Sequence, residues 1–591
     1  MATVMHATGS APGEATTDAP DEDLRPAAEV MDLGRLGCGH QSRLSFVRSL
    51  VRQMCAQRWR IRRLRFDLDS HGCGKAIYRV ETRDGDFDFV VFADKLRPEE
   101  RSDRVIAERW DLTCALCQAP VDDAYLAELA ANVPRQEAGR CDSRVLVLSR
   151  ANRSARNFDA VLDRLAAGEQ PDPAWFARVG YLYRTTAVYG NGKFGIADFA
   201  RLQRWPAFAR PFSAQMLTVY LVRAFSLDQI EHMARCKSPR TAVPMDRAMA
   251  RYLGIGNSTG LGMAPFLIRH PRLINRWVWN RERGLARVLS ASRTPSMELL
   301  HRLEVLTRRA RTHVAQWLAD DPAQQAANQI TIRELGSLLR WIRWQRRHAA
   351  LPDSPWRRLF TSARRRWSVE TQELLVSLLL ELHPELVDSL EDDMLAPERD
   401  DLRPDMSAQT LKQLVESRYV WALAYDFDQP DQMHYFWYRS EEKEEPRLGV
   451  RHEEPGAERE MDLGIARLVA GCHRDLAAFL RHQPEAGVVD FLIDYPQHRG
   501  IVRRVQNVGD LHYGEVRANL LAVDCLPIHL LRCKLAFFGA TKFDPRSDRW
   551  VRITLFQGAP LPDELHHEPD PDWCFPVMPE GGEATGENIC Q

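Results

Sequence analysis

The chain has 591 residues, of which 45% are hydrophobic and 27% charged, and its formal net charge at pH 7 is −1. These proportions are those of globular proteins and exclude a largely disordered or low-complexity chain. A net charge near zero also excludes a whole-chain electrostatic field that would attract nucleic acid or an anionic membrane surface. The length predicts several domains rather than one.

The basic residues are strongly biased, with 8 Lys against 72 Arg, which indicates the codon usage of a GC-rich bacterial genome. Clusters of arginine are therefore weak evidence for nucleic-acid binding, whereas each lysine, a compact and titratable charge, is more informative. The 12 cysteines are scattered along the chain, which predicts reduced thiols and a cytoplasmic protein. No signal peptide and no apolar run of about 20 residues is found, so we expect no membrane partner. The sequence indicates no particular cofactor and no oligomeric state.

Hydrophobic periodicity predicts an α+β fold, with a small N-terminal mixed sheet and helices, a mainly helical middle and a C-terminal α+β region. Acid- and proline-rich stretches mark the boundaries. The expected parts are a disordered tail at 1–33, an N-terminal α+β region at 34–205, a helical core region at 206–395, a C-terminal α+β region at 396–560 and a loose acidic and proline-rich tail at 561–591.

In the N-terminal region the pattern predicts a helix, a three-stranded unit and further mixed elements. The expected elements are a helix at 42–58, strands at 64–68, 77–82 and 87–92, a helix at 100–117, a strand at 145–148, a polar loop at 149–154 and a helix at 176–184. Asp84 and Gly85 form a strong hairpin signal between two of the strands. Cys114 and Cys117 form a C-x-x-C pair without a second pair, which favours two buried thiols over a metal or redox site.

Two loops rich in glycine and asparagine are the main candidates for a ligand site. The first spans 254–271, contains Gly256, Asn257, Ser258, Thr259, Gly260 and Gly262, and is expected to lead into a helix near Gly262. The second spans 189–195 and contains Gly190, Asn191, Gly192 and Lys193. Backbone N–H groups at a helix start attract phosphate or carboxylate, so both loops could form an anion cradle. Tight turns with close packing at the glycines would explain the same residues.

A helix at 212–236 is apolar nearly all round, which predicts a buried core helix lying in sequence between the two loops. Further helices are expected at 299–318, 330–342 and 374–386, with Pro384 ending or kinking the last. Residues 301–370 contain 14 Arg and 6 acidic residues, interleaved with Trp317, Trp341, Trp344, Trp356 and Trp367. Such a stretch could hold single-stranded nucleic acid by stacking, although amphipathic helices with solvated arginines are the favoured explanation.

In the C-terminal region we expect strands at 419–425, 434–438, 488–493 and 550–555 and an amphipathic helix at 461–481. A charge-rich segment at 437–449 contains Tyr438, Lys443 and Arg447. Clustered titratable groups of this kind could serve acid–base chemistry if they are buried, but most charge runs are solvated loops.

The favoured hypothesis is an enzyme that binds an anionic small molecule, bearing phosphate or carboxylate, through the two Gly/Asn loops. Lys193 would supply charge or act as a base, and Tyr438, Lys443 and Arg447 are weaker catalytic candidates; no metal site and no reaction class is indicated. The alternatives are a nucleic-acid-binding protein that uses helices 301–370, and an interaction or scaffold protein without catalysis. Nucleic acid is the less expected partner.

Overall fold

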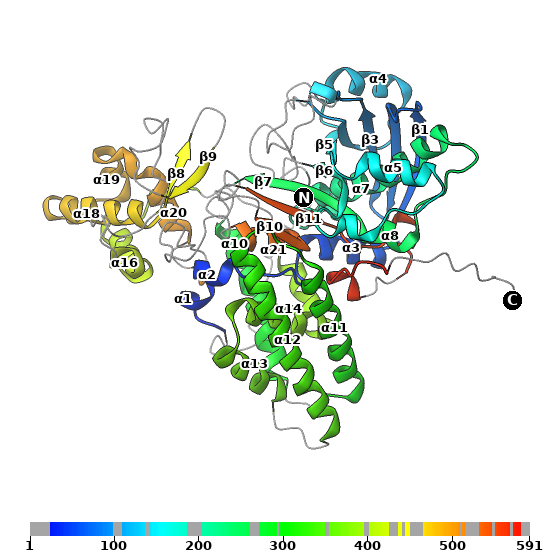
Figure 1. Cartoon of the computed structure of the whole chain (residues 1–591). Helices are drawn as coiled ribbons and strands as arrows, with labels where there is room; N and C mark the ends of the chain where they lie inside the picture. Colours follow the sequence, from blue (N-terminus) through cyan, green and yellow to red (C-terminus); the bar gives the residue numbers. More distant parts are fainter. Residues whose placement is uncertain are drawn as a thin grey trace, which may run out of the picture.

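The computed structural model describes most of the chain. The described residues are 24–97, 109–135, 141–185, 202, 204–260, 271–291, 295–348, 354–394, 401–424, 435–439, 444–448, 465–508, 511–513, 531–545, 550–567 and 571–580. They form an α+β fold with one large mixed sheet, a helical body and a smaller helical lobe (Figure 1). Among these residues no helix is both long and apolar enough to cross a bilayer.

The large sheet has nine strands in the order β1-β2-β3-β4-β5-β6-β7-β11-β10. Its strands are β1 (Arg60–Leu68), β2 (Gly74–Thr82), β3 (Gly85–Ala93), β4 (Leu112–Gln118), β5 (Val145–Arg153), β6 (Tyr181–Thr185), β7 (Gly254–Gly260), β10 (Lys542–Pro545) and β11 (Trp550–Leu555). Neighbours run antiparallel, except that β6 and β7 run parallel. The last two strands come from the far end of the sequence, so both ends of the chain build this sheet.

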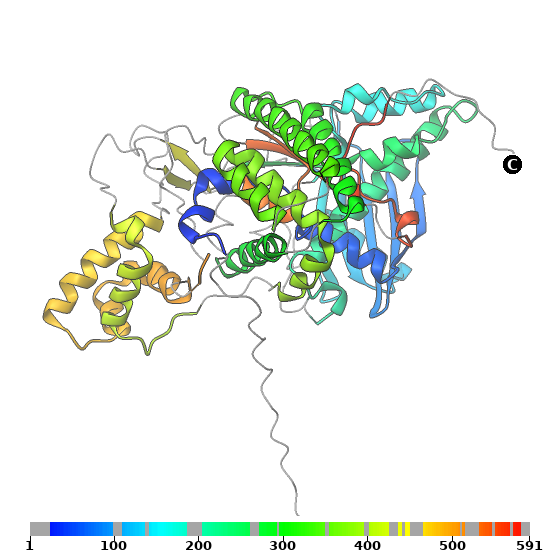
Figure 2. The ribbon, with the colours of Figure 1, turned by 90° about the horizontal axis from the view of Figure 1, so that it is seen from below.

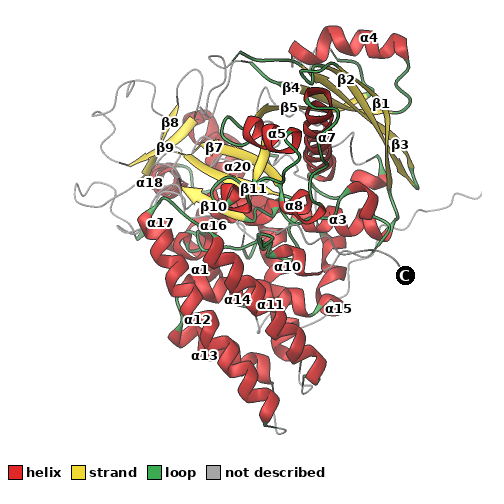
Figure 3. Ribbon diagram, turned by 45° about the vertical axis from the view of Figure 1, so that its right-hand side comes forward, coloured by secondary structure: helices red, strands yellow, loops and turns green. Residues whose placement is uncertain are grey.

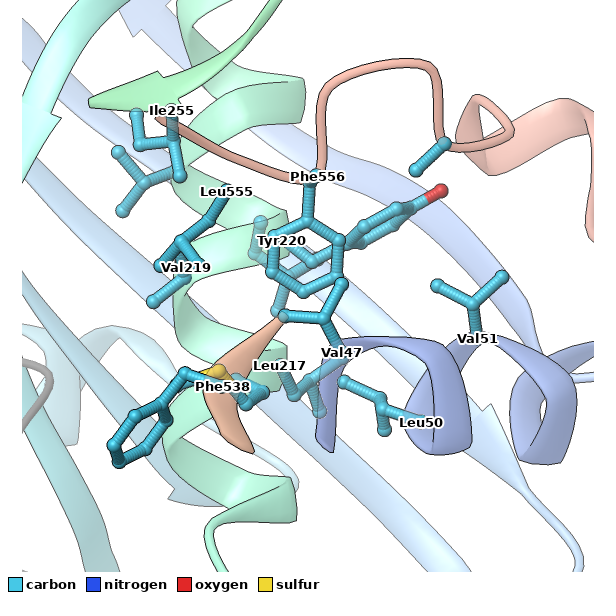
Figure 4. Packing of buried hydrophobic residues seen from close by; sticks show 14 of the residues in the cluster. Val47, Leu50, Val51, Leu217, Val219, Tyr220, Ile255, Phe538, Leu555 and Phe556 are labelled. Atoms are coloured by element: carbon cyan, nitrogen blue, oxygen red, sulfur yellow. The ribbon is translucent and has the colours of Figure 1, made fainter. Parts of the chain in front are cut away.

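Helix α7 (Ser213–Lys237) packs against one face of the sheet and is buried along most of its length. Its apolar side chains meet those of β7, β11 and helix α3 (Phe46–Ala56), as Figure 4 shows for Val219, Tyr220, Ile255, Leu555 and Val47. Helix α5 (Phe158–Ala166) joins the same core, and α8 (Arg247–Tyr252) precedes β7. Helix α4 (Asp123–Asn132) covers part of the opposite face with a smaller apolar cluster. The prediction of a buried core helix at 212–236 is confirmed.

The helical body has its own apolar core. It contains α10 (Pro271–Ser290), α11 (Met297–Gln316), α12 (Pro322–Arg347), α13 (Pro355–Arg366), α14 (Val369–Leu382) and α15 (Pro384–Val387). Figure 2 shows these helices beside the sheet, seen from below. Helix α14 is buried from Glu370 to Leu382 and lies at the centre of the body. It ends just before Pro384, as the sequence predicts.

Buried ion pairs join the helical body to segments that are distant in sequence. Glu370 accepts hydrogen bonds from Arg532 of α21 (Leu531–Phe538), one of them 2.8 Å long, and Glu381 accepts from Arg48 of α3 at 2.8 Å. Glu373 pairs with the segment that carries α1 (Ala27–Val30) and α2 (Leu33–Leu36). Guanidinium groups take the place of water as hydrogen-bond donors to these carboxylates. A buried charge is tolerated when it is paired and hydrogen-bonded in this way.

The smaller helical lobe has a third core of its own and lies to one side of the rest in Figures 1 and 2. It consists of α16 (Ala408–Arg418), α17 (Val420–Leu423), α18 (Ile465–His482), α19 (Val488–Asp494) and α20 (Arg499–Val508). Strands β8 (Tyr435–Arg439) and β9 (Glu444–Leu448) form a separate two-stranded sheet. Figure 3 distinguishes the helices of the lobe, in red, from the neighbouring strands β8 and β9, in yellow.

Several predicted elements are wrong. The segments expected as helices at 100–117 and 176–184 contain strands β4 and β6 in their described parts, and the polar loop at 149–154 is mostly the end of β5. The expected strands at 419–425 and 488–493 are helices α17 and α19. The periodicity of a short apolar run does not distinguish a helix from a strand. The secondary structure of these segments is therefore set by their pairing and packing with distant parts of the chain.

The segment near the C-terminus is packed against the body as far as it is described. Trp573, Cys574 and Phe575 are buried, and the carbonyls of Phe575 and Pro576 accept hydrogen bonds from α11. The prediction of a loose tail at 561–591 is therefore wrong for this part. The acidic and proline-rich composition of the segment predicted a loose tail, but its side chains Trp573, Cys574 and Phe575 pack into the apolar cores.

Candidate functional site

Strands β6 and β7 are the place in the sheet where ligand binding is most favoured by topology. They are adjacent and parallel, with Thr185 opposite Asn257, and α7 forms part of the crossover between them. Their carboxyl ends therefore lie at the same edge of the sheet. In open α/β sheets, ligands bind outside the carboxyl ends of parallel strands where the connections diverge.

The segment expected as the first Gly/Asn loop is strand β7, so the prediction of a loop is wrong for 254–260. Gly256 pairs with Arg184 on one side and with Thr554 on the other, and Asn257 likewise lies between β6 and β11. The backbone here is engaged in the sheet on both sides. A ligand at this position would therefore have to be held by side chains or by the neighbouring helix start, not by a backbone cradle.

Close packing explains the first glycines of this strand. A Cβ atom on Gly256 would lie 2.3 Å from Cζ of Tyr181, and one on Gly254 would lie 2.4 Å from the carbonyl oxygen of Leu555. Both distances are far below van der Waals contact. The strand therefore requires glycine at these positions for structural reasons.

Asn257 is the predicted site residue with the most informative surroundings. Its side chain is 1% exposed, and its Nδ2 has no hydrogen-bond partner among the described residues. Strand alternation places it on the same face as Ile255, which is the face covered by α7 (Figure 4). A buried amide without a partner costs free energy, so such a group suggests a missing ligand or water.

Gln215, in the first turn of α7, has the same property. It is 1% exposed, and neither amide atom has a partner within the part of the chain that the structure describes. Nε of Arg223 donates to the carbonyl oxygen of Leu253 at 2.6 Å, and Val219 packs beside Ile255. Gln215 precedes Val219 and Arg223 at intervals of four residues, so it lies on the same side of α7 as these two residues.

The start of α7 adds a favourable field for an anion. Its N-cap residue, Phe212, has φ 59° and makes no side-chain capping hydrogen bond. The first N–H groups of a helix carry partial positive charge and bind anions when a side chain does not cap them. Gln215 and the start of α7 thus belong to the helix that covers this face of the sheet.

The other face of the same strands carries three buried arginines. Arg150, Arg184 and Arg552 are each no more than 7% exposed and lie on β5, β6 and β11. The guanidinium carbon of Arg150 lies 3.8 Å from the centre of the Trp110 ring, and burial lowers the pKa of Arg150 to about 9. All three have further contacts, so they supply positive potential near the site and are not vacant binding groups.

The remaining predicted residues divide into three groups. Gly190, Asn191, Gly192, Lys193, Gly262 and Lys443 lie outside the described residues. Ser258, Thr259 and Gly260 continue β7 opposite Arg552, Val551 and Trp550. Tyr438 and Arg447 lie on β8 and β9, opposite Glu445 and Phe436, in a sheet separate from the one that carries Asn257.

Sequence reasoning missed Gln215, Arg184 and Arg552. A glutamine in an otherwise apolar helix face was the available signal for the first. For Arg552, the alternation of Trp550, Arg552 and Thr554 with apolar residues predicted the strand, but not that its polar face is buried.

No metal centre is found among the described residues, where no group of three or more metal-binding side chains occurs. Cys114 and Cys117 lie on opposite faces of β4, one in each apolar cluster, and burial raises the pKa of both thiols.

Comparison with protein families, curated proteins and solved structures finds no match to this chain.

Proposed function

We propose that the protein binds an anionic small molecule, bearing phosphate or carboxylate, at the carboxyl ends of β6 and β7, and acts on it as an enzyme. The observation that carries the proposal is the buried, unpartnered Nδ2 of Asn257 beside the parallel strand pair. Gln215 and the uncapped start of α7 support it from the same face.

The proposed roles follow from chemistry and position. The amides of Asn257 and Gln215 orient the ligand, and the start of α7 stabilises its negative charge. Gly190, Asn191, Gly192 and Lys193 follow Thr185 closely in sequence and are proposed to complete the site, with Lys193 as charge or base. Tyr438, Lys443 and Arg447 are weaker candidates for catalysis. The nine cysteines that the structure describes are all free, which fits the proposed bacterial cytosol.

The test uses Asn257→Leu with a panel of phosphate, pyrophosphate, citrate and nucleotides in a thermal-shift assay. A ligand at 100 times its dissociation constant stabilises the wild type by about 2.7 kcal/mol. Leucine removes an unpaired amide of similar size, so the unliganded variant should be as stable as the wild type or slightly more stable. The ligand-induced shift should be lost in this variant and kept in Asn132→Leu, a control on α4.

Two results would contradict the proposal. One is the absence of any shift with the panel in the wild type. The other is a loss of more than about 2 kcal/mol in unliganded Asn257→Leu, since that would mean that the amide already has a structural partner.

A further inference from the structure

The outward surfaces of α11, α12 and α13 carry an unusual density of arginine. Within 301–370 the sequence has 14 Arg and 6 acidic residues. Twelve of these arginines are exposed, namely Arg308, Arg311, Arg333, Arg340, Arg343, Arg346, Arg347, Arg357, Arg358, Arg364, Arg365 and Arg366. Figure 1 shows that these helices extend downward, away from the large sheet.

The acidic residues of this region do not neutralise that surface. Glu304 accepts from Arg308 and Arg346 and lies 3.7 Å from Arg343. The other four described acids are also engaged: Asp320 with Arg178, Asp321 in capping α12, Glu334 with Ser368, and Glu370 with Arg532. Seven exposed arginines then remain without an ion pair among the described residues: Arg311, Arg333, Arg340, Arg347, Arg358, Arg365 and Arg366.

These seven residues, which we call the arginine band, lie on connected elements. Glu304 joins α11 to the C-terminal half of α12, and Glu334 joins α12 to the residue that caps α14, two residues beyond α13. GC-rich codon usage explains why the residues are Arg and not Lys. It does not explain why arginines outnumber acidic residues by 14 to 6 in this region.

The exposure of the tryptophans distinguishes single-stranded nucleic acid, whose bases stack on aromatic rings, from other polyanions. Trp317 and Trp356 are buried at 3% and 1% exposure, and Trp344, 49% exposed, already stacks on His348 with ring centroids 4.6 Å apart. Trp341 and Trp367 are half-buried, so Trp344 is the one exposed tryptophan of 301–370 in the described structure and offers a single ring for stacking on unpaired bases. The exposed positions of α13 are occupied by Arg, Ser and Thr alone, so this helix has no apolar face with which to enter a membrane.

We propose that the arginine band binds the phosphate backbone of double-stranded nucleic acid without reading bases. Helix α12 has 26 residues and is about 39 Å long, which exceeds one turn of a duplex. Phosphate contacts from arginine supply affinity that is independent of sequence and falls steeply with salt. This proposal is independent of the small-molecule site.

The experiment measures fluorescence anisotropy of a labelled 20-base-pair duplex with the full-length protein between 50 and 250 mM salt. The test variant is the triple substitution Arg358→Gln, Arg365→Gln and Arg366→Gln. The control triple is Arg164→Gln, Arg235→Gln and Arg474→Gln, which removes the same charge from exposed arginines that each lie beside a carboxylate.

We expect the wild type to bind and the control triple to bind within about twofold of it. The test triple should bind at least about tenfold more weakly, with a slope of log affinity against log salt reduced by about 2 to 3, since each lost phosphate contact removes about 0.9. No binding at 50 mM salt would overturn the proposal. So would equal losses in both triples, or tighter binding to an unpaired strand or to anionic vesicles than to the duplex.

Discussion

Replacing Glu373 by glutamine tests the buried ion cluster that fixes the N-terminal segment to α14. Glu373 accepts hydrogen bonds from Arg25 and Arg35, each 2.8 Å long, and from Arg281. Its side chain is 2% exposed, and the three guanidinium groups hold the pKa of its carboxyl far below the usual range against the effect of burial. Glutamine keeps the shape but leaves the buried Arg25 and Arg281 with Glu282 as their one carboxylate partner among the described residues, while the half-buried Arg35 keeps Glu29.

Breaking one partner of a buried ion pair costs about 3–5 kcal/mol, and we expect Glu373→Gln to fall in that range. The assay is urea unfolding followed by tryptophan fluorescence. Glu385→Gln is the matched control, because Glu385 is 63% exposed and pairs only with His383 in the described structure, so it should cost about 0–1 kcal/mol. If Glu373→Gln and Glu385→Gln lower the free energy of unfolding by amounts that agree within about 0.5 kcal/mol, the reasoning is refuted. Since the folded pKa of Glu373 is lowered, its contribution is present above the ordinary glutamate pKa of 4.5 and is lost as pH falls further.

Two further predictions concern His313 and Gly256. Both ring nitrogens of His313 lie within 2.9 Å of carbonyl oxygens, which favours the protonated ring, but burial prevails and lowers its pKa from 6.5 to about 4. The unfolded state then binds more protons, so the wild type should lose about 2 kcal/mol between pH 7 and pH 5, and urea midpoints of His313→Gln should lack this loss. Gly256→Ala should destabilise by about 1–3 kcal/mol because of the Tyr181 ring, and adding Tyr181→Ala should relieve the clash, giving a cost below the sum of the single changes. A pH response unchanged by His313→Gln, or additive costs in the second pair, would contradict the respective prediction.

Elements with a strong pattern in their own sequence, such as a turn signal or a run of apolar residues, were predicted correctly. The hairpin at Asp84 and Gly85 and helix α7 have strong local signals, and both are present. The final strand, β11, was also predicted from its alternation. These predictions needed no knowledge of distant partners, since local pattern and burial agree.

Strand β7 could not be predicted in the same way. Its sequence, GIGNSTG, has almost no side-chain pattern, and its extended form is stabilised by β11 and by the Tyr181 ring. Gln215 also required the structure, because the sequence does not show that its amide is buried without a hydrogen-bond partner among the described residues. Asn257 was predicted as a ligand-binding residue of a loop; the structure places it in a strand, and its role stays a prediction.

Because Gly260 pairs with Trp550, one edge of β7 must wait for residues 290 positions later in the chain. At about 5–20 residues per second, synthesis takes roughly 15–60 s to supply them. During that time the nascent protein carries an unpaired edge of a glycine-rich strand, the kind of template on which other chains add strands. Biosynthesis of this protein is therefore expected to depend on chaperones or on slow local folding in a way that a sheet built from consecutive strands would not.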